Sequence, residues 1–146
     1  MTGYWRRPAE TAESFRDGWF VTGDIARRDE DGYVTIVGRK AVDIIKTGGF
    51  KISAREVEDV LRRHARIKDV AVVGAPDRTW GQRVVAVVVL EGKGGAISEK
   101  ELLEELSSFC ALHLADYKRP REVRILEELP RNLLGKVQKR RILETL

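Results

Sequence analysis

Three short stretches of this 146-residue chain combine residue types that are used in chemistry on anions. Thr22-Gly23-Asp24 places a carboxylate directly after a glycine, and Gly48-Gly49 lies between Lys46 and Lys51. The third stretch is Gly135-Lys136, in a basic segment near the C-terminus. A glycine pair lets a ligand approach the main chain closely, and lysine ammonium groups neutralise phosphates or carboxylates. Taken separately, each stretch also has a structural explanation as a turn, a bend or a surface charge.

Other side chains that often do chemistry have structural explanations here. His64 and His113 fall near the ends of two predicted helices, where histidine commonly caps or covers the helix end. Cys110 falls on the apolar side of the second helix and is predicted to be an inert core thiol. It is the only cysteine, which excludes an intrachain disulfide and a cysteine zinc site, and a reducing cytoplasmic compartment is expected. The His, Cys and Asp spacing predicts no metal site.

The composition is that of a globular protein, because 42% of the residues are hydrophobic and the 34% that are charged are of mixed sign. The longest unbroken apolar run, residues 84–90, is too short to span a bilayer. The formal net charge is only +4, but residues 118–141 hold nine Lys and Arg against three Glu. This basic segment predicts contact with phosphates or, more simply, a solvated surface. It contains no aromatic residue to stack on bases, which argues against nucleic acid.

Local signals predict the elements that must position these residues. Asp31-Gly32 between two β-branched runs is a strong β-hairpin signal. Ser53 with Glu56, and Ser98 with Glu101, have the spacing of helix capping boxes, and the apolar stripes that follow predict two amphipathic helices. The first of these helices is expected to reach about Ala65.

The predicted fold class is α+β. Three apolar runs rich in valine or isoleucine predict strands, at residues 70–73, 84–90 and 122–126. The order of the elements indicates a β-hairpin followed by a small mixed three-stranded sheet, with helices packed on one face.

Taken together and in this order, the motifs resemble the adenylate-forming superfamily, which includes the AMP-forming acyl-CoA synthetases. The resemblance runs nearly from end to end and lies closest to malonyl-, methylmalonyl- and fatty-acid-CoA ligases. The matching motifs are Gly18-Trp19-Phe20-Val21-Thr22-Gly23-Asp24, Asp31-Gly32-Tyr33, Gly38-Arg39, Asp43-Ile44-Ile45-Lys46-Thr47-Gly48-Gly49-Phe50-Lys51-Ile52, Glu56-Val57-Glu58, Pro76-Asp77, Trp80-Gly81, Tyr117-Lys118-Arg119-Pro120 and Gly135-Lys136.

The resemblance implies a domain organisation and a reaction. Residues 1–39 are expected to be the end of the large N-terminal domain of such an enzyme. Residues 40–146 are expected to be the mobile C-terminal domain of the same enzyme. The implied reaction joins a carboxylic acid to ATP, with Mg²⁺, to give an acyl-adenylate, and then transfers the acyl group to CoA. The phosphate loop and the acid pocket of such enzymes are missing from this chain. We therefore expect it not to catalyse the full reaction alone.

The resemblance also implies roles for individual residues. Asp24 would accept hydrogen bonds from the two ribose hydroxyls, and Arg39 would approach the nucleotide. Lys136 would neutralise charge between the acid and the α-phosphate in the first step.

For the second step, Gly48 and Gly49 would line the channel of the pantetheine arm, with Lys46 and Lys51 near the CoA phosphates. The resemblance also implies that the C-terminal domain rotates about a hinge between the two steps. This hinge is expected at Lys40 or Ala41, where the segment is one residue longer than in many relatives.

Two other interpretations remain open at this stage. The first is an adenylating enzyme that loads a carrier protein, which also delivers a pantetheine arm. The second belongs to a different class and is a small basic module that binds nucleic acid or an acidic partner through residues 118–141. The expected partners of the favoured interpretation are the large N-terminal domain and a carboxylic acid, without nucleic acid or a membrane span.

Overall fold

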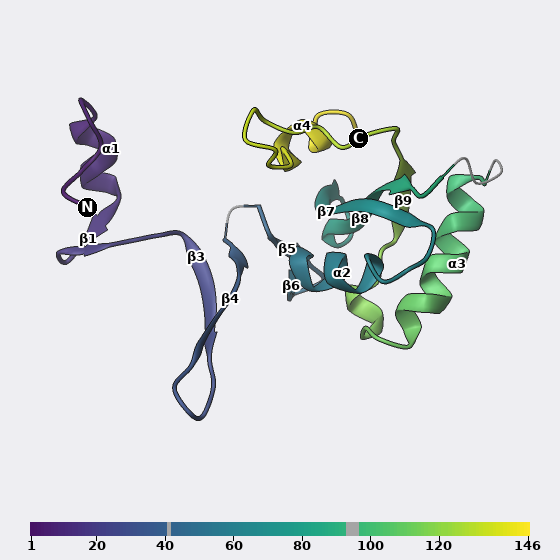
Figure 1. Cartoon of the computed structure of the whole chain (residues 1–146). Helices are drawn as coiled ribbons and strands as arrows, with labels where there is room; N and C mark the ends of the chain where they lie inside the picture. Colours follow the sequence, from purple (N-terminus) through teal and green to yellow (C-terminus); the bar gives the residue numbers. More distant parts are fainter. Residues whose placement is uncertain (41, 93–96) are drawn as a thin grey trace.

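The computed structural model describes residues 1–40, 42–92 and 97–146. The predicted hinge residue Ala41 lies outside this described part. The chain begins with an extended arm that carries helix α1 (Pro8–Glu13) and two short strands, β1 (Phe15–Arg16) and β2 (Trp19–Phe20), which pair with each other. A long hairpin of β3 (Asp24–Arg28) and β4 (Val34–Arg39) follows, as predicted. Figure 1 shows the arm and the hairpin standing beside the body formed by the rest of the chain.

The body is built on a five-stranded sheet in which β6 (Phe50–Ser53), β5 (Ile44–Thr47), β8 (Gly81–Leu90) and β7 (Ile67–Asp77) follow one another. The fifth strand, β9 (Glu122–Ile125), pairs in parallel with β8. The predicted α+β class is confirmed, but the prediction of three strands was wrong. The two missed strands, β5 and β6, have only four residues each, and Gly48-Gly49 joins them into a tight hairpin.

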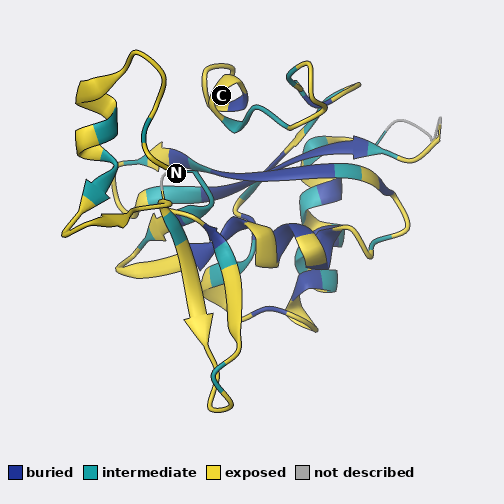
Figure 2. Cartoon of the chain, turned by 60° about the vertical axis from the view of Figure 1, so that its left-hand side comes forward, coloured by how far each residue is buried: buried dark blue, intermediate teal, exposed yellow. Residues whose placement is uncertain are grey.

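Helices cover both faces of the sheet, whereas the sequence predicted helices on one face only. Helices α2 (Ala54–Leu61) and α3 (Glu99–Ala111) lie against one face, and a C-terminal segment with α4 (Lys139–Leu143) lies against the other. Successive side chains of β7 and β8 point to opposite faces, so their continuous valine runs need a cover on each side. A short 3-10 helix (Asp116–Lys118) precedes β9. Figure 2 shows the buried sheet beside an exposed hairpin.

The two predicted capping boxes differ in the structure. The Ser98 and Glu101 box is complete at the start of α3. At the start of α2, the Ser53 side chain accepts from the Glu56 N–H, but the Glu56 carboxylate pairs with Lys118 instead of returning to Ser53. Helix α2 ends at Leu61, before the predicted Ala65, because the backbone tightens into i→i−3 hydrogen bonds there.

A bulge positions the hairpin against α2. The register of β3 and β4 shifts between Ile25 and Ala26, which leaves Val37 outside the ladder. The free Val37 carbonyl accepts a hydrogen bond of 2.9 Å from the Ser53 hydroxyl, so the α2 N-cap also contacts the hairpin. No helix within the described ranges is long and apolar enough to cross a membrane.

Candidate functional site

Asp24 and Arg39, two of the predicted nucleotide-binding residues, lie directly opposite each other in the β3–β4 ladder. The Arg39 Nε approaches the Asp24 Oδ1 to 2.8 Å. Gly23, with a φ of +75°, turns the chain just before Asp24, and its carbonyl accepts from the Lys40 N–H. More than half of the Arg39 side chain is exposed, so this carboxylate–guanidinium pair can contact a ligand above the hairpin.

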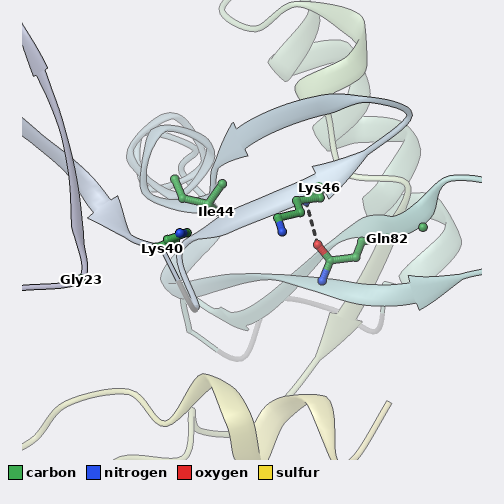
Figure 3. Close-up of a pocket in the computed structure, with 6 residues that line it drawn as sticks. Gly23, Lys40, Ile44, Lys46 and Gln82 are labelled. Atoms are coloured by element: carbon green, nitrogen blue, oxygen red, sulfur yellow. Dashed lines mark hydrogen bonds between the residues drawn. The ribbon is translucent and has the colours of Figure 1, made fainter. Parts of the chain in front are cut away.

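A shallow pocket of about 690 Å³ lies where the hairpin meets the sheet. Lys40 and Lys46 line it together with Gly23, Ile44, Gly81 and Gln82 (Figure 3). The Gln82 side chain fixes β5 beside it, because its Oε1 accepts from the Lys46 N–H at 2.7 Å. A predicted hinge residue and a predicted phosphate-binding residue therefore line the same pocket.

The glycine pair forms a two-residue turn between Thr47 and Phe50, and both glycines have positive φ, +53° and +83°. This is the geometry of a tight hairpin turn that residues with a Cβ rarely adopt. A Cβ on Gly48 would lie 2.8 Å from Trp80 Cε3, whereas a Cβ on Gly49 would meet nothing within 4 Å. The lack of a Cβ at Gly48 thus allows Trp80 to pack closely against the turn, whereas the Cβ position of Gly49 faces open space.

Lys46 and Lys51 are cross-strand partners in the β5–β6 hairpin, on either side of this turn. Directly opposed residues point to the same face of a sheet, and like charges in that position are destabilising. In the described part of the chain, neither lysine has a carboxylate within ion-pair distance. This arrangement favours an anionic ligand beside the glycine turn.

Half-exposed aromatic side chains, for which the sequence predicted no role, surround the same turn. Phe50 stacks on Tyr117 with ring centroids 4.2 Å apart, and Arg121 lies over the Trp80 ring at 5.9 Å. The available signal was that Phe50, Trp80 and Tyr117 all belong to the recognised motifs. Flat rings beside cations suit a heteroaromatic base that carries phosphates.

Lys136 lies on an ordered loop with its side chain in solvent. Arg131 and Val137 form a β-bridge at the base of the loop, and the Asn132 Oδ1 accepts from the N–H groups of Leu134 and Lys136. Gly135 makes the bend with a φ of +78°. These bonds fix the loop backbone, and the Lys136 side chain extends from it as an exposed residue.

Lys136 and the glycine turn lie near opposite ends of β5. Lys136 and Asp43, which immediately precedes β5, line the same pocket, whereas Gly48 immediately follows that strand. Five residue steps at roughly 3.3 Å each separate Asp43 and Gly48 by about 16 Å. The two predicted catalytic features are therefore not placed side by side.

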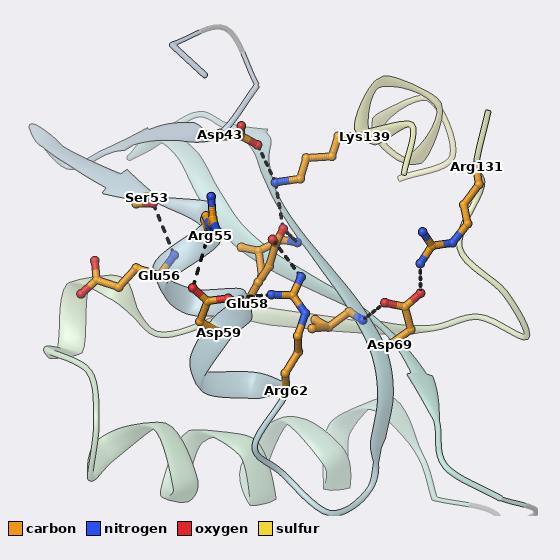
Figure 4. Close-up of polar contacts among 12 residues, drawn as sticks. Asp43, Ser53, Arg55, Glu56, Glu58, Asp59, Arg62, Asp69, Arg131 and Lys139 are labelled. Atoms are coloured by element: carbon orange, nitrogen blue, oxygen red, sulfur yellow. Dashed lines mark hydrogen bonds and ion pairs between the residues drawn. The ribbon is translucent and has the colours of Figure 1, made fainter. Parts of the chain in front are cut away.

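An ion-pair network that the sequence did not predict lies between the Lys136 loop and α2 (Figure 4). The Lys139 Nζ contacts both the Asp43 Oδ1 and the Glu58 Oε1 at 2.8 Å. Glu58 is buried and also accepts from the Val72 N–H and from Arg62. No local pattern marked this network, because Asp43 and Lys139 are 96 positions apart.

The surroundings of Asp43 lower its pKa. Burial acts to raise it, but the hydrogen bonds from Lys139 and from the Arg39 N–H, with the positive charges of Lys139 and Lys136, outweigh burial and hold the pKa of Asp43 below the ordinary value of an aspartate. A lowered folded-state pKa stabilises the fold above the unfolded-state pKa, and this contribution disappears as the pH falls through the folded-state value.

We therefore expect acid to destabilise the wild-type chain more than an Asp43→Asn variant. The measurement is the urea midpoint of both proteins at pH 5 and at pH 3. The urea midpoint of the wild type should fall further between the two pH values, because only the wild type has the Asp43 carboxyl to protonate. Equal losses would show that the Asp43 pairing contributes no pH-dependent stability.

The histidines and the cysteine have the predicted structural roles. His64 and His113 both pack edge-on against Phe109. Cys110 is fully buried in the core, and burial raises the pKa of its thiol.

Most of the cations in residues 118–141 are paired. Six of the nine contact a carboxylate: Lys118, Arg119, Arg121, Arg124, Arg131 and Lys139. Paired cations have little attraction left for a polyanion, which disfavours the interpretation as a nucleic-acid module.

Comparison with known proteins agrees with the motif resemblance. The profile of the AMP-binding enzyme C-terminal domain matches residues 56–136. A mitochondrial malonate–CoA ligase of Bos taurus is 50% identical over 144 residues, which cover 98% of this chain and 24% of that enzyme. A long-chain-fatty-acid–CoA ligase of Bacillus subtilis is 45% identical and is covered to 25%. The chain thus spans about a quarter of the length of these relatives.

Solved structures give the same result. ATP-bound MatB from Rhodopseudomonas palustris is 41% identical, with a TM-score of 0.83 over 98% of this chain and 27% of that one. Apo MatB from the same organism has a TM-score of 0.67 over the same 98%. Because the family profile covers more than half of the 146 residues, the chain belongs to the AMP-binding enzyme C-terminal domain family.

Proposed function

We propose that this chain is the C-terminal part of an ATP-dependent acid–CoA ligase, which forms an acyl-adenylate and then an acyl-CoA thioester. The observation that carries the proposal is that Lys136 lines the pocket at the Asp43 end of β5, whereas Gly48-Gly49 lies at the other end of that strand. One active centre can meet these two features only in turn, which suits a reaction of two successive steps.

The proposed domain boundary lies between residues 39 and 40, with the pivot at Lys40 or Ala41. Residues 1–39 then complete the large N-terminal domain, and residues 40–146 are the moving part. The two MatB structures support a movable arrangement, because one protein matches this chain with TM-scores of 0.83 and 0.67. The arrangement described here is nearer to the ATP-bound form.

In the first proposed step, a carboxylate oxygen of the acid attacks the α-phosphorus of ATP and pyrophosphate leaves with the electron pair of the broken P–O bond. Asp24 holds the ribose hydroxyls, since a carboxylate has acceptor sites for both hydroxyls of a vicinal diol. Arg39 orients Asp24 and adds positive charge above the hairpin. Lys136 reduces the repulsion between the two anions and stabilises the charge on the pentavalent phosphorus.

In the second proposed step, the CoA thiol attacks the acyl carbonyl, and AMP leaves as the thioester forms. The thin pantetheine arm passes the open side of Gly49. Lys46 and Lys51 meet CoA phosphates, and the rings of Phe50, Tyr117 and Trp80 offer a surface for the adenine. CoA carries three phosphate groups and a carrier-linked arm carries one, so the opposed lysines favour free CoA over a carrier protein.

Mg²⁺ enters the proposal as part of the ATP substrate. Among residues 1–40, 42–92 and 97–146, no three His, Cys, Asp or Glu side chains converge as metal ligands. The ion would therefore be held mainly by the large domain and the phosphates.

The proposed acid is a small dicarboxylate such as malonate, and the proposed compartment is the cytoplasm. The names of the malonate–CoA ligases among the relatives support this acid, as does the lengthened segment after Arg39. The buried free thiol of Cys110 suits a reducing compartment. The bovine relative carries a mitochondrial name, so fractionation of cells into cytosol and mitochondria tests the compartment.

The test of the proposed function uses the full-length protein that contains this chain. With ATP, Mg²⁺, malonate and CoA, we expect AMP and malonyl-CoA in equal amounts, measured by chromatography. A phosphopantetheinylated carrier protein in place of CoA should be a much poorer acceptor. Absence of acyl-adenylate with malonate and with a panel of other acids would refute the proposal.

The 146-residue chain alone is the matched control, and it should release no AMP. Salt-dependent binding of this chain to random-sequence DNA tests the rival class, since a phosphate-driven binder loses roughly 10³-fold or more in affinity between 50 and 200 mM salt. We expect little binding at either salt concentration.

A further inference from the structure

Asp43 joins two parts of the molecule that are far apart in the sequence. Its Oδ2 accepts from the Arg39 N–H at 2.9 Å, and its Oδ1 accepts from the Lys139 ammonium at 2.8 Å. Its main-chain N–H and carbonyl are also bound, to the Arg39 carbonyl and to the Ala54 N–H. The short segment between Arg39 and Asp43, which contains the proposed pivot, is thus tied through one carboxylate to the C-terminal segment.

Lys139 is held on its other side by Glu58. The Lys139 Nζ lies 2.8 Å from the Glu58 Oε1, and only 14% and 9% of the two side chains are exposed. A buried lysine needs paired carboxylates to compensate its desolvation, and Asp43 and Glu58 both provide that pairing. Its ammonium is therefore occupied, and Lys139 is not available to bind a substrate phosphate.

The position of Lys139 is transmitted to Lys136 by a rigid stretch of backbone. Two residues, Val137 and Gln138, separate the two lysines, and the Gln138 N–H donates to the Pro130 carbonyl at 2.7 Å. The Arg131–Val137 bridge and the Asn132 bonds close the loop on the other side. A shift of the Lys139 anchor would therefore move the Lys136 loop as a unit.

We infer that Lys139 is a positioning residue for Lys136, and that its pair with Asp43 couples the backbone of the hinge to the placement of the Lys136 loop. This inference rests on the proposed function, in which Lys136 acts in adenylate formation. It assigns to the Asp43–Lys139–Glu58 network a role in the first step only, because the glycine turn of the second step lies at the far end of β5.

The central test is Lys139→Met in the full-length enzyme, with the two half-reactions measured separately. Methionine keeps a similar length without the charge. Because a misplacement of about 1 Å can cost roughly 10²-fold in rate, we expect ATP–pyrophosphate exchange to fall by about 10- to 100-fold. Thioester formation from acyl-adenylate supplied ready-made should change by less than about threefold, since its residues are not displaced.

Arg62→Met is the matched structural control. Arg62 contacts the same buried carboxylate at 3.3 Å, through the Glu58 Oε2, but lies on the α2 side of the network, away from the Lys136 loop. Urea unfolding of both variants reports their stability. Arg62→Met should lower the urea midpoint while it leaves pyrophosphate exchange within about threefold of wild type. An equal loss of exchange in the two variants would show that Lys139 acts only through stability.

A double variant separates action through Lys136 from an independent effect. If Lys139 works by placing Lys136, Lys136→Ala with Lys139→Met should exchange pyrophosphate no more slowly than Lys136→Ala alone. A further loss in the double variant would overturn the inference. Asp43→Asn, which keeps the side-chain shape, should reproduce the selective loss if Lys139→Met proves too unstable to assay.

The outcomes distinguish this inference from the proposed function. A wild-type enzyme that makes no acyl-adenylate refutes the proposed function itself. A wild-type enzyme that is active and depends on Lys136, but whose Lys139→Met variant matches Arg62→Met, refutes the positioning role alone.

Discussion

Lys136→Ala in the full-length enzyme should slow acyl-adenylate formation by roughly 10²-fold or more, the scale for loss of one preorganised electrostatic contact in a transition state. The loop backbone is fixed by Asn132 and the Arg131–Val137 bridge, so the substitution removes the charge without removing the loop. Rates of ATP–pyrophosphate exchange measure this step. Thioester formation from supplied acyl-adenylate should survive, because the glycine turn lies at the other end of β5 from Asp43 and the Lys136 pocket.

Lys100→Ala is the control for this substitution. Lys100 is an exposed lysine on α3, and its loss should leave both half-reactions unchanged. If Lys136→Ala slowed both half-reactions equally, the two steps would not use separate faces of this domain, and the central assumption of the proposed mechanism would be wrong.

Gly49→Leu should have the opposite effect, with adenylate formation retained and thioester formation slowed by roughly 10²-fold. The Cβ of a residue that replaces Gly49 would enter open space, since it would meet nothing within 4 Å. The leucine side chain would instead occupy the space through which we expect the pantetheine arm to pass. The measurement is the rate of CoA thioester formation, compared with pyrophosphate exchange in the same variant.

Gly49→Ala separates the bulk of the side chain from backbone strain. Gly49 has a φ of +83°, where any residue with a Cβ is strained by about 1–2 kcal/mol. Alanine and leucine share that strain, but only leucine reaches into the channel. An alanine variant as impaired as the leucine variant would mean that turn geometry, and not an open channel, is what the second step needs. Gly48 cannot serve as this control, because its Cβ would collide with Trp80.

Local signals in the sequence were sufficient where a structure is decided within a few residues. Asp31-Gly32 predicted the β3–β4 hairpin, and in the structure a turn closed by the Gly32 N–H on the Asp29 carbonyl joins the strands, with a φ of +90° at Gly32. Ser98 and Glu101 predicted the start of α3, since the two side chains satisfy N–H groups within one helical turn. The same signal was only half right at Ser53, where Lys118, 62 positions from Glu56, draws the Glu56 carboxylate away.

Within the candidate site, the sequence identified single residues but not their neighbours. Asp24, Arg39 and Lys136 were found because recognised motifs contain them. That Asp24 meets Arg39, and that Lys46 meets Lys51, depends on strand register, and a shift of one residue would point these side chains to opposite faces. The ring pair of Phe50 and Tyr117 depends in addition on where the 3-10 helix packs.

The sequence by itself therefore determined the α+β class, the hairpin, the starts of the main helices and the residues with chemical potential. Only the tertiary structure decided that two short strands enlarge the sheet and that the C-terminal segment covers its second face. It also decided that Lys139 lies between Asp43 and Glu58. The physical reason is range: turns and caps are bonded within a few residues, whereas sheet order and buried ion pairs join segments whose contact depends on the whole fold.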